Sequence, residues 1–161
     1  MIASHHNPQF SARYQGYTDM DQDQRWEQLV ALDEELLKGG VILSEWCSFI
    51  DREADIAFTS GAHLASILTA VSGIETYLRS EHAETGKERL VELINRATID
   101  SSLKNDLHTL RKYRNKWVYV DGPWDDVNLL ERPEEMEKEL EGMAFFAARA
   151  LRRTIYENQW L

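Results

Sequence analysis

The stretch LRKYRNKWVYV, residues 110–120, places a positive charge inside an apolar helical face. Counted at steps of three and four, that face holds Leu103, Leu107, Leu110, Trp117 and Val118. Arg114 lies in the same row, where a helix that buries one face should carry an apolar side chain. A guanidinium keeps its charge in practice, so this position needs a physical reason.

Helical spacing also predicts helices on either side of this stretch. The expected helices cover about 21–38, 41–58, 61–80, 90–94, 101–120 and 133–155, with the second either separate from the first or its continuation past two glycines. The candidate N-caps are Asp21, Thr59 or Ser60, and Asp100 or Ser101. Pro133 suits the first turn of the last helix, where its missing N–H has no partner to lose. Gly122 and Pro123 stop the helix that carries the opening stretch.

The first two helices are expected to bury one apolar face each. For the first helix the inward residues are Trp26, Leu29, Val30, Leu36 and Leu37. For the second they are Ile42, Leu43, Trp46, Phe49, Ile50 and Ala57. The sequence has no strand-like alternation, tandem repeat or glycine-rich phosphate loop. We therefore predict an all-α fold, an up-and-down helical bundle of about five helices, as a single domain over 21–161 with a mobile N-terminal arm over 1–20.

Composition and charge exclude several classes of protein. No apolar run approaches the roughly 18 residues of a membrane helix, and the first residues lack the pattern of a secretory signal. Cys47 is the only cysteine, so we expect a small core hydrophobe in a chain from a reducing cytoplasm. The net charge of −10 argues against broad nucleic-acid binding. An RNA partner would therefore meet a small basic patch, or a cleft contributed by two chains.

A second charge interrupts the apolar face of the helix expected at 61–80. That face holds Leu64, Ile67, Leu68, Val71 and Leu78, and Glu75 falls among them. An isolated buried charge is prohibitive, whereas a hydrogen-bonded pair of opposite charges is tolerated. We expect Glu75 and Arg114 to face each other across the core or to meet a partner chain, either as a functional pair or as an ion pair that sets helix registry.

The segment LHTLRKYRNKWVYV, residues 107–120, resembles the signature helix of HEPN domains, which are small helical bundles of bacterial RNA-targeting and toxin–antitoxin systems. The family pattern is an Arg, usually followed by a polar residue such as Asn, and then a His after four to six intervening positions. Arg114 and Asn115 match this pattern, and the spacing of four lands on Tyr119. The segment GAHLASILTAVSGIETYLRSE is similar to the preceding family helix, whose acidic residue matches Glu75. The resemblance covers roughly residues 40–155.

The resemblance implies a HEPN-like metal-independent endoribonuclease that acts as a dimer, with the motif helices of two chains forming one cleft. In this family the RNA 2′-hydroxyl attacks the neighbouring phosphate and leaves a 2′,3′-cyclic phosphate. This chemistry needs a cation on the phosphate, a task suited to Arg114, and a proton carrier near neutral pH, a task suited to His. Tyr119 stands in the second place, and a phenol is a much weaker base than an imidazole at neutral pH. A degenerate nuclease and an inactive descendant both remain open.

Other residues of the motif helix add positive charge or a proton carrier. Arg111, Lys112 and Lys116 form a basic collar, which either attracts phosphate or is an ordinary solvated face. His108 lies beside Arg111 around the helix, and we assign it with the collar to RNA or phosphate binding. His63 is a weaker candidate for proton transfer.

Two further classes of function stay open beside the nuclease. A catalytically silent HEPN-like dimer would hold RNA, a nucleotide or a protein partner such as a cognate antitoxin, in bacterial antiviral defence or regulation. A purely structural bundle would use Arg114 and Glu75 only for registry. A di-iron bundle is excluded because no Glu has a His three residues later, and a lone Cys without a His-x-x-x-His pair argues against zinc. We therefore expect no metal, no cofactor and no membrane, and a homodimer through the motif helix.

Overall fold

The computed structural model describes residues 20–124 and 126–161, and the regular structure in these ranges is helical. The long helices are α2 (Gln22–Leu36), α3 (Glu45–Thr59), α4 (His63–His82), α6 (Ser101–Val118) and α8 (Pro133–Ile155), and the short ones are α5 (Leu90–Arg96) and α7 (Val127–Glu131). The predicted all-α class is confirmed. The arm expected over residues 1–20 lies outside the described residues except for Met20. Among the helices described, none has the length and apolar character to cross a membrane.

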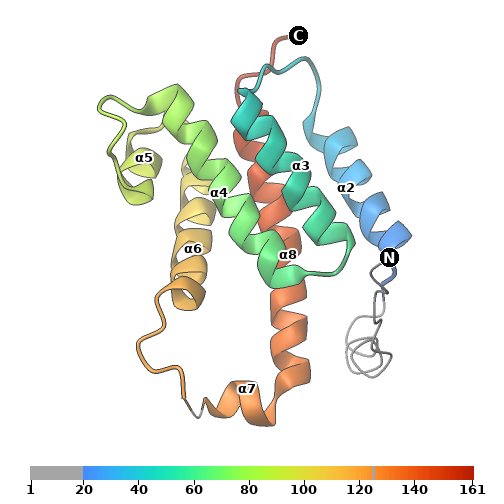
Figure 1. Cartoon of the computed structure of the whole chain (residues 1–161). Coiled ribbons are helices and arrows are strands. Elements are labelled where there is room, and N and C mark those ends of the chain that lie inside the picture. The colour runs from blue at the N-terminus through green and yellow to red at the C-terminus, as the bar shows by residue number, and fades with distance from the viewer. Residues whose placement is uncertain (1–19, 125) are drawn as a thin grey trace, which may run out of the picture.

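The long helices run alternately up and down, as Figure 1 shows. α2 rises, α3 descends, α4 rises, α6 descends and α8 rises. α4 and α8 pack against each other, with α2 and α3 on one side of the bundle and α5 and α6 on the other. α7, which the sequence analysis did not predict, lies at the lower end between α6 and α8. The predicted up-and-down bundle is therefore present.

Local sequence signals explain most helix starts. The Asp21 carboxylate accepts from the backbone N–H of Gln24 at 2.9 Å, and the Gln24 side chain accepts from the Asp21 N–H at 2.9 Å, which completes a capping box. Asp100 caps α6 through the N–H of Leu103 at 2.9 Å. Pro133 occupies the first turn of α8. These three predicted starts are confirmed.

The predicted N-cap of α4 is wrong. Thr59 ends α3, and its hydroxyl donates to a backbone carbonyl one turn earlier at 3.0 Å. Gly61 then takes a φ of 76°, which a residue without a Cβ adopts readily, and the chain turns sharply. α4 begins at His63, with Ala62 as an N-cap that makes no side-chain hydrogen bond. Because the turn is this tight, Thr59 and Ser60 remain on the α3 side of it.

The core lies between α4 and α8 and the inner rows of the other helices. Its largest fully buried side chains are Phe58, Leu29, Ile67, Ile74, Leu78, Leu93, Ile94, Leu103, Leu107, Leu110, Leu151 and Ile155. Cys47 is buried, as predicted, and burial raises the pKa of its thiol to about 11. The thiol is therefore protonated at neutral pH and behaves as a small apolar side chain.

Part of the predicted inner faces of α2 and α3 is exposed instead. The exposed residues are Trp26, Val30, Leu37, Ile42, Trp46 and Phe49. On α2 the buried row holds Leu29 and Leu32 together with Arg25, whose Nε donates to the Thr59 carbonyl at 3.0 Å. α2 thus carries two apolar rows, and a cation lies in the one that faces the core. Periodicity alone could not decide between the two rows.

Arg152 of α8 is the centre of a buried charged cluster that joins α2, α3 and α8. Its side chain donates to both Asp55 carboxylate oxygens at 2.9 and 2.8 Å and to Asp33 at 2.8 Å, and the residue is 2% exposed. The Tyr156 hydroxyl donates to the same Asp33 oxygen at 2.7 Å. Burial alone would lower the pKa of Arg152, but Asp55 and Asp33 outweigh it and raise that pKa above its ordinary value. The cluster therefore fixes how α2 and α3 sit on α8.

Asp51 of α3 lies beside this cluster and has incomplete hydrogen bonding. Its Oδ1 atom is buried without a partner, and burial, followed by the charge of Asp55, raises the pKa of Asp51 from 3.8 to about 6. The native state therefore holds a proton on Asp51 more tightly than the unfolded chain does. Stability is lost as pH rises from the unfolded pKa through the folded one.

Replacing Asp51 by Asn should remove this penalty. We expect Asp51→Asn to raise the free energy of unfolding by about 1 to 2 kcal/mol above pH 7 and to change it little near pH 4. Urea unfolding followed by circular dichroism at both pH values measures the effect, with the exposed Asp121→Asn as control. An Asp51→Asn effect of equal size at both pH values would contradict the assigned pKa.

Candidate functional site

The residues of the motif helix singled out from the sequence lie on the last turns of α6, at the lower end of the bundle in Figure 1. Leu103, Leu107 and Leu110 are buried, as predicted. Arg114 follows one turn after Leu110 and is half-buried, and Val118 is exposed. The apolar row is therefore buried over its first turns and opens towards solvent from Arg114 onwards.

Among residues 20–124 and 126–161, Arg111 and Arg114 differ from the other arginines in having no partner. Both are half-buried, and neither makes a hydrogen bond or an ion pair with any residue that the structure describes. Arg25 bonds to backbone carbonyls. The remaining described arginines pair with carboxylates: Arg52, Arg79, Arg89, Arg96, Arg132, Arg149, Arg152 and Arg153. In a chain with 28 acidic and 18 basic residues, two arginines one turn apart without a carboxylate are available to an external anion.

Buried polar atoms without a hydrogen-bond partner gather on the same turns of α6. They are Nε of Arg111, the hydroxyl of Tyr113, Nε of Arg114, Oδ1 of Asn115 and Nε1 of Trp117. Leaving such a group unsatisfied costs about 1–3 kcal/mol, and most buried polar groups do have a partner. Half of the ten such atoms in the described residues lie on this segment, and the others are spread over Gln28, Asp51, His63 and Glu88. These turns of α6 are therefore a place where a partner from outside the chain can bind.

Lys116 is two residues after Arg114, so it lies on the opposite side of α6, and it faces α8. Its Nζ is 3.5 Å from the Glu139 carboxylate and lies over the rings of Tyr113 and Trp117, 5.2 and 5.5 Å from their centroids. Burial, followed by Glu139, raises the pKa of the Tyr113 hydroxyl to about 12, so it stays protonated at neutral pH. Lys116 is thus held within the chain, and the predicted basic collar is divided between two sides of α6.

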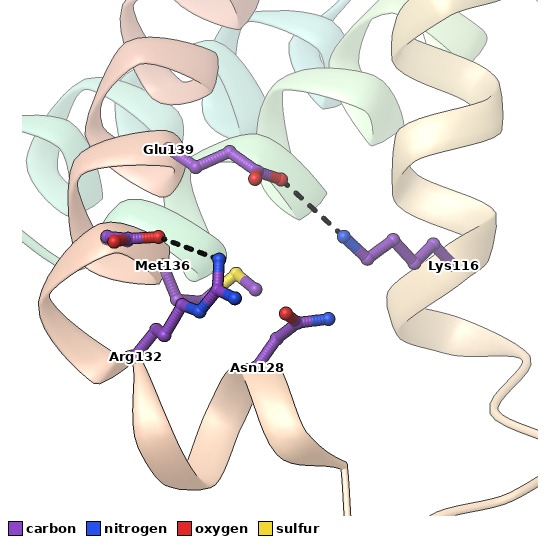
Figure 2. Close-up of a pocket in the computed structure, with 6 residues that line it drawn as sticks. Lys116, Asn128, Arg132, Met136 and Glu139 are labelled. Carbon is purple, nitrogen blue, oxygen red and sulfur yellow. Dashed lines mark hydrogen bonds and ion pairs between the residues drawn. The ribbon is translucent and has the colours of Figure 1, made fainter.

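A pocket of about 270 Å³ opens beside Lys116, where α6, α7 and α8 meet (Figure 2). It is lined by Lys116, Asn128, Arg132, Glu135, Met136 and Glu139. Arg132 pairs with Glu135 at 3.6 Å, and Lys116 pairs with Glu139, so each cation in the pocket already has a carboxylate. A phosphate would have to displace these carboxylates. The pocket therefore suits an anion less well than the turn that carries Arg114.

His108 lies one turn before Arg111, and α5 holds its ring. The Nε2 atom is 2.9 Å from Oδ1 of Asn95. Burial, followed by the charges of Arg111, Lys112 and Lys104, lowers the pKa of His108. The imidazole is therefore neutral at pH 7 and can accept a proton.

Glu75 pairs with Arg79, one turn later on α4, at 2.8 Å. Arg79 also donates to the backbone carbonyls of Gly86 and Glu88 in the loop before α5. α4 and α6 run in opposite directions, so their C-terminal halves, which carry Glu75 and Arg114, point to opposite ends of the bundle (Figure 1). The direct Glu75–Arg114 pair expected from the sequence is therefore not formed within the chain.

Tyr119 ends α6 as its C-cap, and its N–H donates to the Asn115 carbonyl at 2.9 Å. The side chain is 68% exposed and makes no hydrogen bond to the described part of the chain. Lys112 is also exposed and has no ion pair there. The phenol is thus open to solvent at the end of the helix that carries Arg114.

His63, the second candidate proton carrier, is buried at the start of α4. Neither ring nitrogen has a hydrogen-bond partner, and burial, followed by the charge of Arg25, lowers the pKa of His63. The ring is therefore neutral at pH 7. Because protein encloses it, His63 is less suited than His108 to meet a ligand from solution.

The motif helix presents cations and neutral groups rather than metal ligands. In residues 20–124 and 126–161, no group of three or more His, Cys, Asp and Glu side chains is arranged to hold a metal ion. Comparison of the chain with family models, with curated proteins and with solved structures gives no significant match in any of the three. The basis for a functional proposal is therefore the chemistry of the side chains on α6.

Two features at this end of the bundle were not predicted from the sequence. The Asp126 carboxylate caps α7 through the N–H groups of Asn128 and Leu129, and an Asp before an apolar run is a signal that predicts such a helix. Lys116 also contacts the rings of Tyr113, three residues before it, and of Trp117, the next residue. Residues three apart on a helix are neighbours, so the contact with Tyr113 could have been predicted from the sequence. Only the approach of Lys116 to α8 needed the structure.

Proposed function

We propose that this chain is a HEPN-like RNA-associated protein of a bacterial defence, toxin–antitoxin or regulatory system, and a degenerate metal-independent endoribonuclease that acts as a cytoplasmic dimer. One observation carries the proposal. Arg111 and Arg114, one turn apart on the motif helix, lack any partner in the described chain although acidic groups outnumber basic ones. Adjacent guanidinium groups match the oxygens of a phosphate, and phosphate contacts dominate the affinity of proteins for nucleic acids.

The proposed roles follow from the chemistry of each side chain. Arg114 and Arg111 bind the scissile phosphate and stabilise the charge that develops on it, and the Asn115 amide adds a hydrogen-bond donor. The RNA 2′-hydroxyl loses its proton and attacks phosphorus, the bond to O5′ breaks with a proton supplied to that oxygen, and a 2′,3′-cyclic phosphate results. His108, neutral at pH 7, and the exposed Tyr119 phenol are the candidates for these two proton transfers.

The phenol at position 119 favours a second candidate function. Because a phenol accepts a proton poorly at neutral pH and His108 is held by Asn95, the chain can also be a catalytically silent module. Such a module would bind RNA, a nucleotide or a protein partner such as a cognate antitoxin. It would keep the contacts of Arg111 and Arg114 and show no cleavage.

Exposed apolar side chains next to the motif helix support the dimer. The last residue of α6, Val118, is exposed, and the connector between α6 and α8 exposes Tyr119, Val120, Trp124, Val127, Leu129 and Leu130, of which Trp124 is 83% exposed. Apolar groups gathered in this way usually contact another molecule. A second copy that packs its connector here would bring two motif helices close to one RNA. We expect sedimentation equilibrium to give a molecular mass of twice the chain mass of 18.7 kDa. A measured mass equal to that of one chain would overturn the dimer.

The RNA affinity of arginine variants tests the proposal. We expect Arg114→Ala and Arg111→Ala each to weaken binding of a labelled single-stranded RNA about tenfold, because each removes charge-assisted hydrogen bonds to phosphate. The slope of log affinity against log salt should also fall by about 0.7 for each lost phosphate contact. Fluorescence anisotropy at several salt concentrations measures both quantities.

A control variant that removes one positive charge elsewhere distinguishes binding at Arg111 and Arg114 from non-specific electrostatic attraction of RNA. Lys87 is an exposed cation without an ion pair in the described chain, and it lies in the loop before α5. Lys87→Ala should leave RNA affinity unchanged. Equal weakening by Lys87→Ala and Arg114→Ala, or no RNA binding by the unmodified chain, overturns the proposal.

A further inference from the structure

We propose that the outer surface of α2 and α3 is a docking site for a basic amphipathic helix of a partner protein. This inference goes beyond the proposed RNA function, because α2 and α3 lie on the side of the bundle away from α6 (Figure 1). The two proposals therefore concern different surfaces and can fail separately.

The surface is rich in large apolar side chains that no described part of the chain covers. We define the α2–α3 face as Trp26, Val30, Leu37, Ile42, Trp46, Phe49 and Ile56, all of which are exposed. Trp46 is 76% exposed and Phe49 is 59% exposed. Single exposed apolar residues are ordinary, whereas a group of this size marks a contact surface.

Helical spacing places the exposed α2 residues on one side of that helix. Trp26, Val30 and Asp33 follow one another at steps of four and three, so they share one side of α2. Asp33 accepts from Arg152, which also binds Asp55 of α3. The side of α2 that carries Trp26 and Val30 therefore adjoins the cluster that joins α2, α3 and α8.

The exposed α3 residues lie on the outer side of that helix. Phe49 and Ile56 are seven residues apart and share one side of α3, away from the buried Cys47, Ala54 and Phe58. Trp46 lies one turn before Phe49 on the outer side. The two apolar rows thus lie on the exposed sides of two helices that contact each other.

The charge around the α2–α3 face identifies the occupant. Four carboxylates without an ion pair in the described chain lie among its apolar residues: Asp23, Glu27, Glu34 and Glu45. The nearby cations are already engaged, because Arg52 pairs with Glu53 at 3.1 Å and Lys38 donates to the Glu34 carbonyl at 2.7 Å. An apolar strip bordered by free carboxylates complements a helix with one apolar and one basic face.

The same charge disfavours the other occupants. A second copy of this chain would bring like charges together, and an RNA or an anionic membrane would place phosphates against the carboxylates. These occupants are therefore outcomes that would contradict the proposal.

A pair of synthetic peptides tests the docking site on the full chain. The probe is an amphipathic peptide of about 18 residues, or five helical turns, with Leu on one face and Lys on the other, and its partner carries Glu in place of Lys. We expect the Lys peptide to bind, the Glu peptide not to bind, and the affinity to fall with salt. Calorimetry gives the affinity, and amide chemical shifts locate the bound peptide on α2 and α3.

Exposed-residue variants show where the peptide binds without disturbing the core. Trp46→Ser and Phe49→Ser should each weaken binding at least tenfold, whereas the control variants Trp124→Ser and Leu130→Ser should not, although they remove equally exposed apolar groups. Arg114→Ala should leave peptide binding unchanged whatever it does to RNA binding.

Several outcomes overturn the docking proposal. They are equal binding of both peptides, loss of binding in the Trp124→Ser control, and no binding of the Lys peptide. Tighter binding of anionic phospholipid vesicles than of the peptide, abolished by Trp46→Ser, would assign the face to a membrane instead. Self-association abolished by Phe49→Ser would assign it to a second copy.

Discussion

Replacement of Arg152 by Met is expected to lower the free energy of unfolding by about 3 to 5 kcal/mol. Arg152 is 2% exposed, and its guanidinium donates to both oxygens of Asp55 and to one oxygen of Asp33. Without it, Asp33, Asp51 and Asp55 remain close together with no cation between them. When one partner of a buried ion pair is removed, the other partner stays buried and keeps its desolvation penalty. This penalty accounts for the size of the effect.

Arg149 provides the matched comparison on the same helix. It also pairs with an acid of α2, since its Nη1 is 2.9 Å from Glu35, but the Arg149 and Glu35 side chains are 38% and 54% exposed. Arg149→Met should therefore change stability far less than Arg152→Met, because exposed ion pairs add little. Urea unfolding monitored by circular dichroism gives both values. Losses of similar size would show that burial of the Arg152 cluster does not control the packing of α2 and α3.

The second large effect is expected in catalysis. Tyr119→His places an imidazole where the resembled family has its proton carrier, one turn from Asn115 and on an exposed helix end. We expect cleavage of single-stranded RNA to rise by about 10² to 10⁴ fold, the usual contribution of a general acid or base. The products should carry a 2′,3′-cyclic phosphate, and a chelator should not inhibit the reaction.

Neighbouring variants make this test specific. Val120→His adds the same imidazole to another exposed residue just beyond the end of α6 and should not raise cleavage. Adding Arg114→Ala to Tyr119→His should abolish the gained activity. If Tyr119→His and the unmodified chain are equally inert on diverse RNAs while Arg114→Ala still weakens RNA binding, the silent binding module is the correct function.

The sequence predicted the helices well because their signals are local. Asp21 and Asp100 precede apolar rows and cap α2 and α6, and the Leu103–Leu107–Leu110 row is buried as its spacing required. Local signals failed where a tertiary contact decided the outcome. Trp26 and Val30 have the same spacing as a buried row, but the row that contains Leu29 is the one packed in the core. The spacing of apolar residues does not distinguish these two rows.

The candidate site shows the same limit. Two charges in two apolar faces suggested that Glu75 and Arg114 pair, but the antiparallel course of α4 and α6 places their C-terminal halves at opposite ends. The sequence analysis did not identify Arg152 as a buried residue. Basic residues are common in the last turn of a helix, so its sequence position is not unusual. Its burial depends on Asp33 and Asp55, which are about a hundred residues away along the chain.

That Arg111 and Arg114 have no partner in the part of the chain that the structure describes could likewise be found only in the structure. Sequence marked Arg114 as unusual, but it could not show that nearly every other arginine of the described residues meets a carboxylate. That contrast gives the two residues their proposed role. A cation without a partner in an acidic chain is the feature that RNA phosphate would satisfy.

Nuclear magnetic resonance of the arginine Nε–H groups measures this central claim directly. Titration of the full chain with a short single-stranded RNA should shift the Nε–H signals of Arg111 and Arg114 together, at one affinity, while the buried signal of Arg152 stays in place. The account is contradicted if the Arg111 and Arg114 signals do not move while RNA binds elsewhere on the chain.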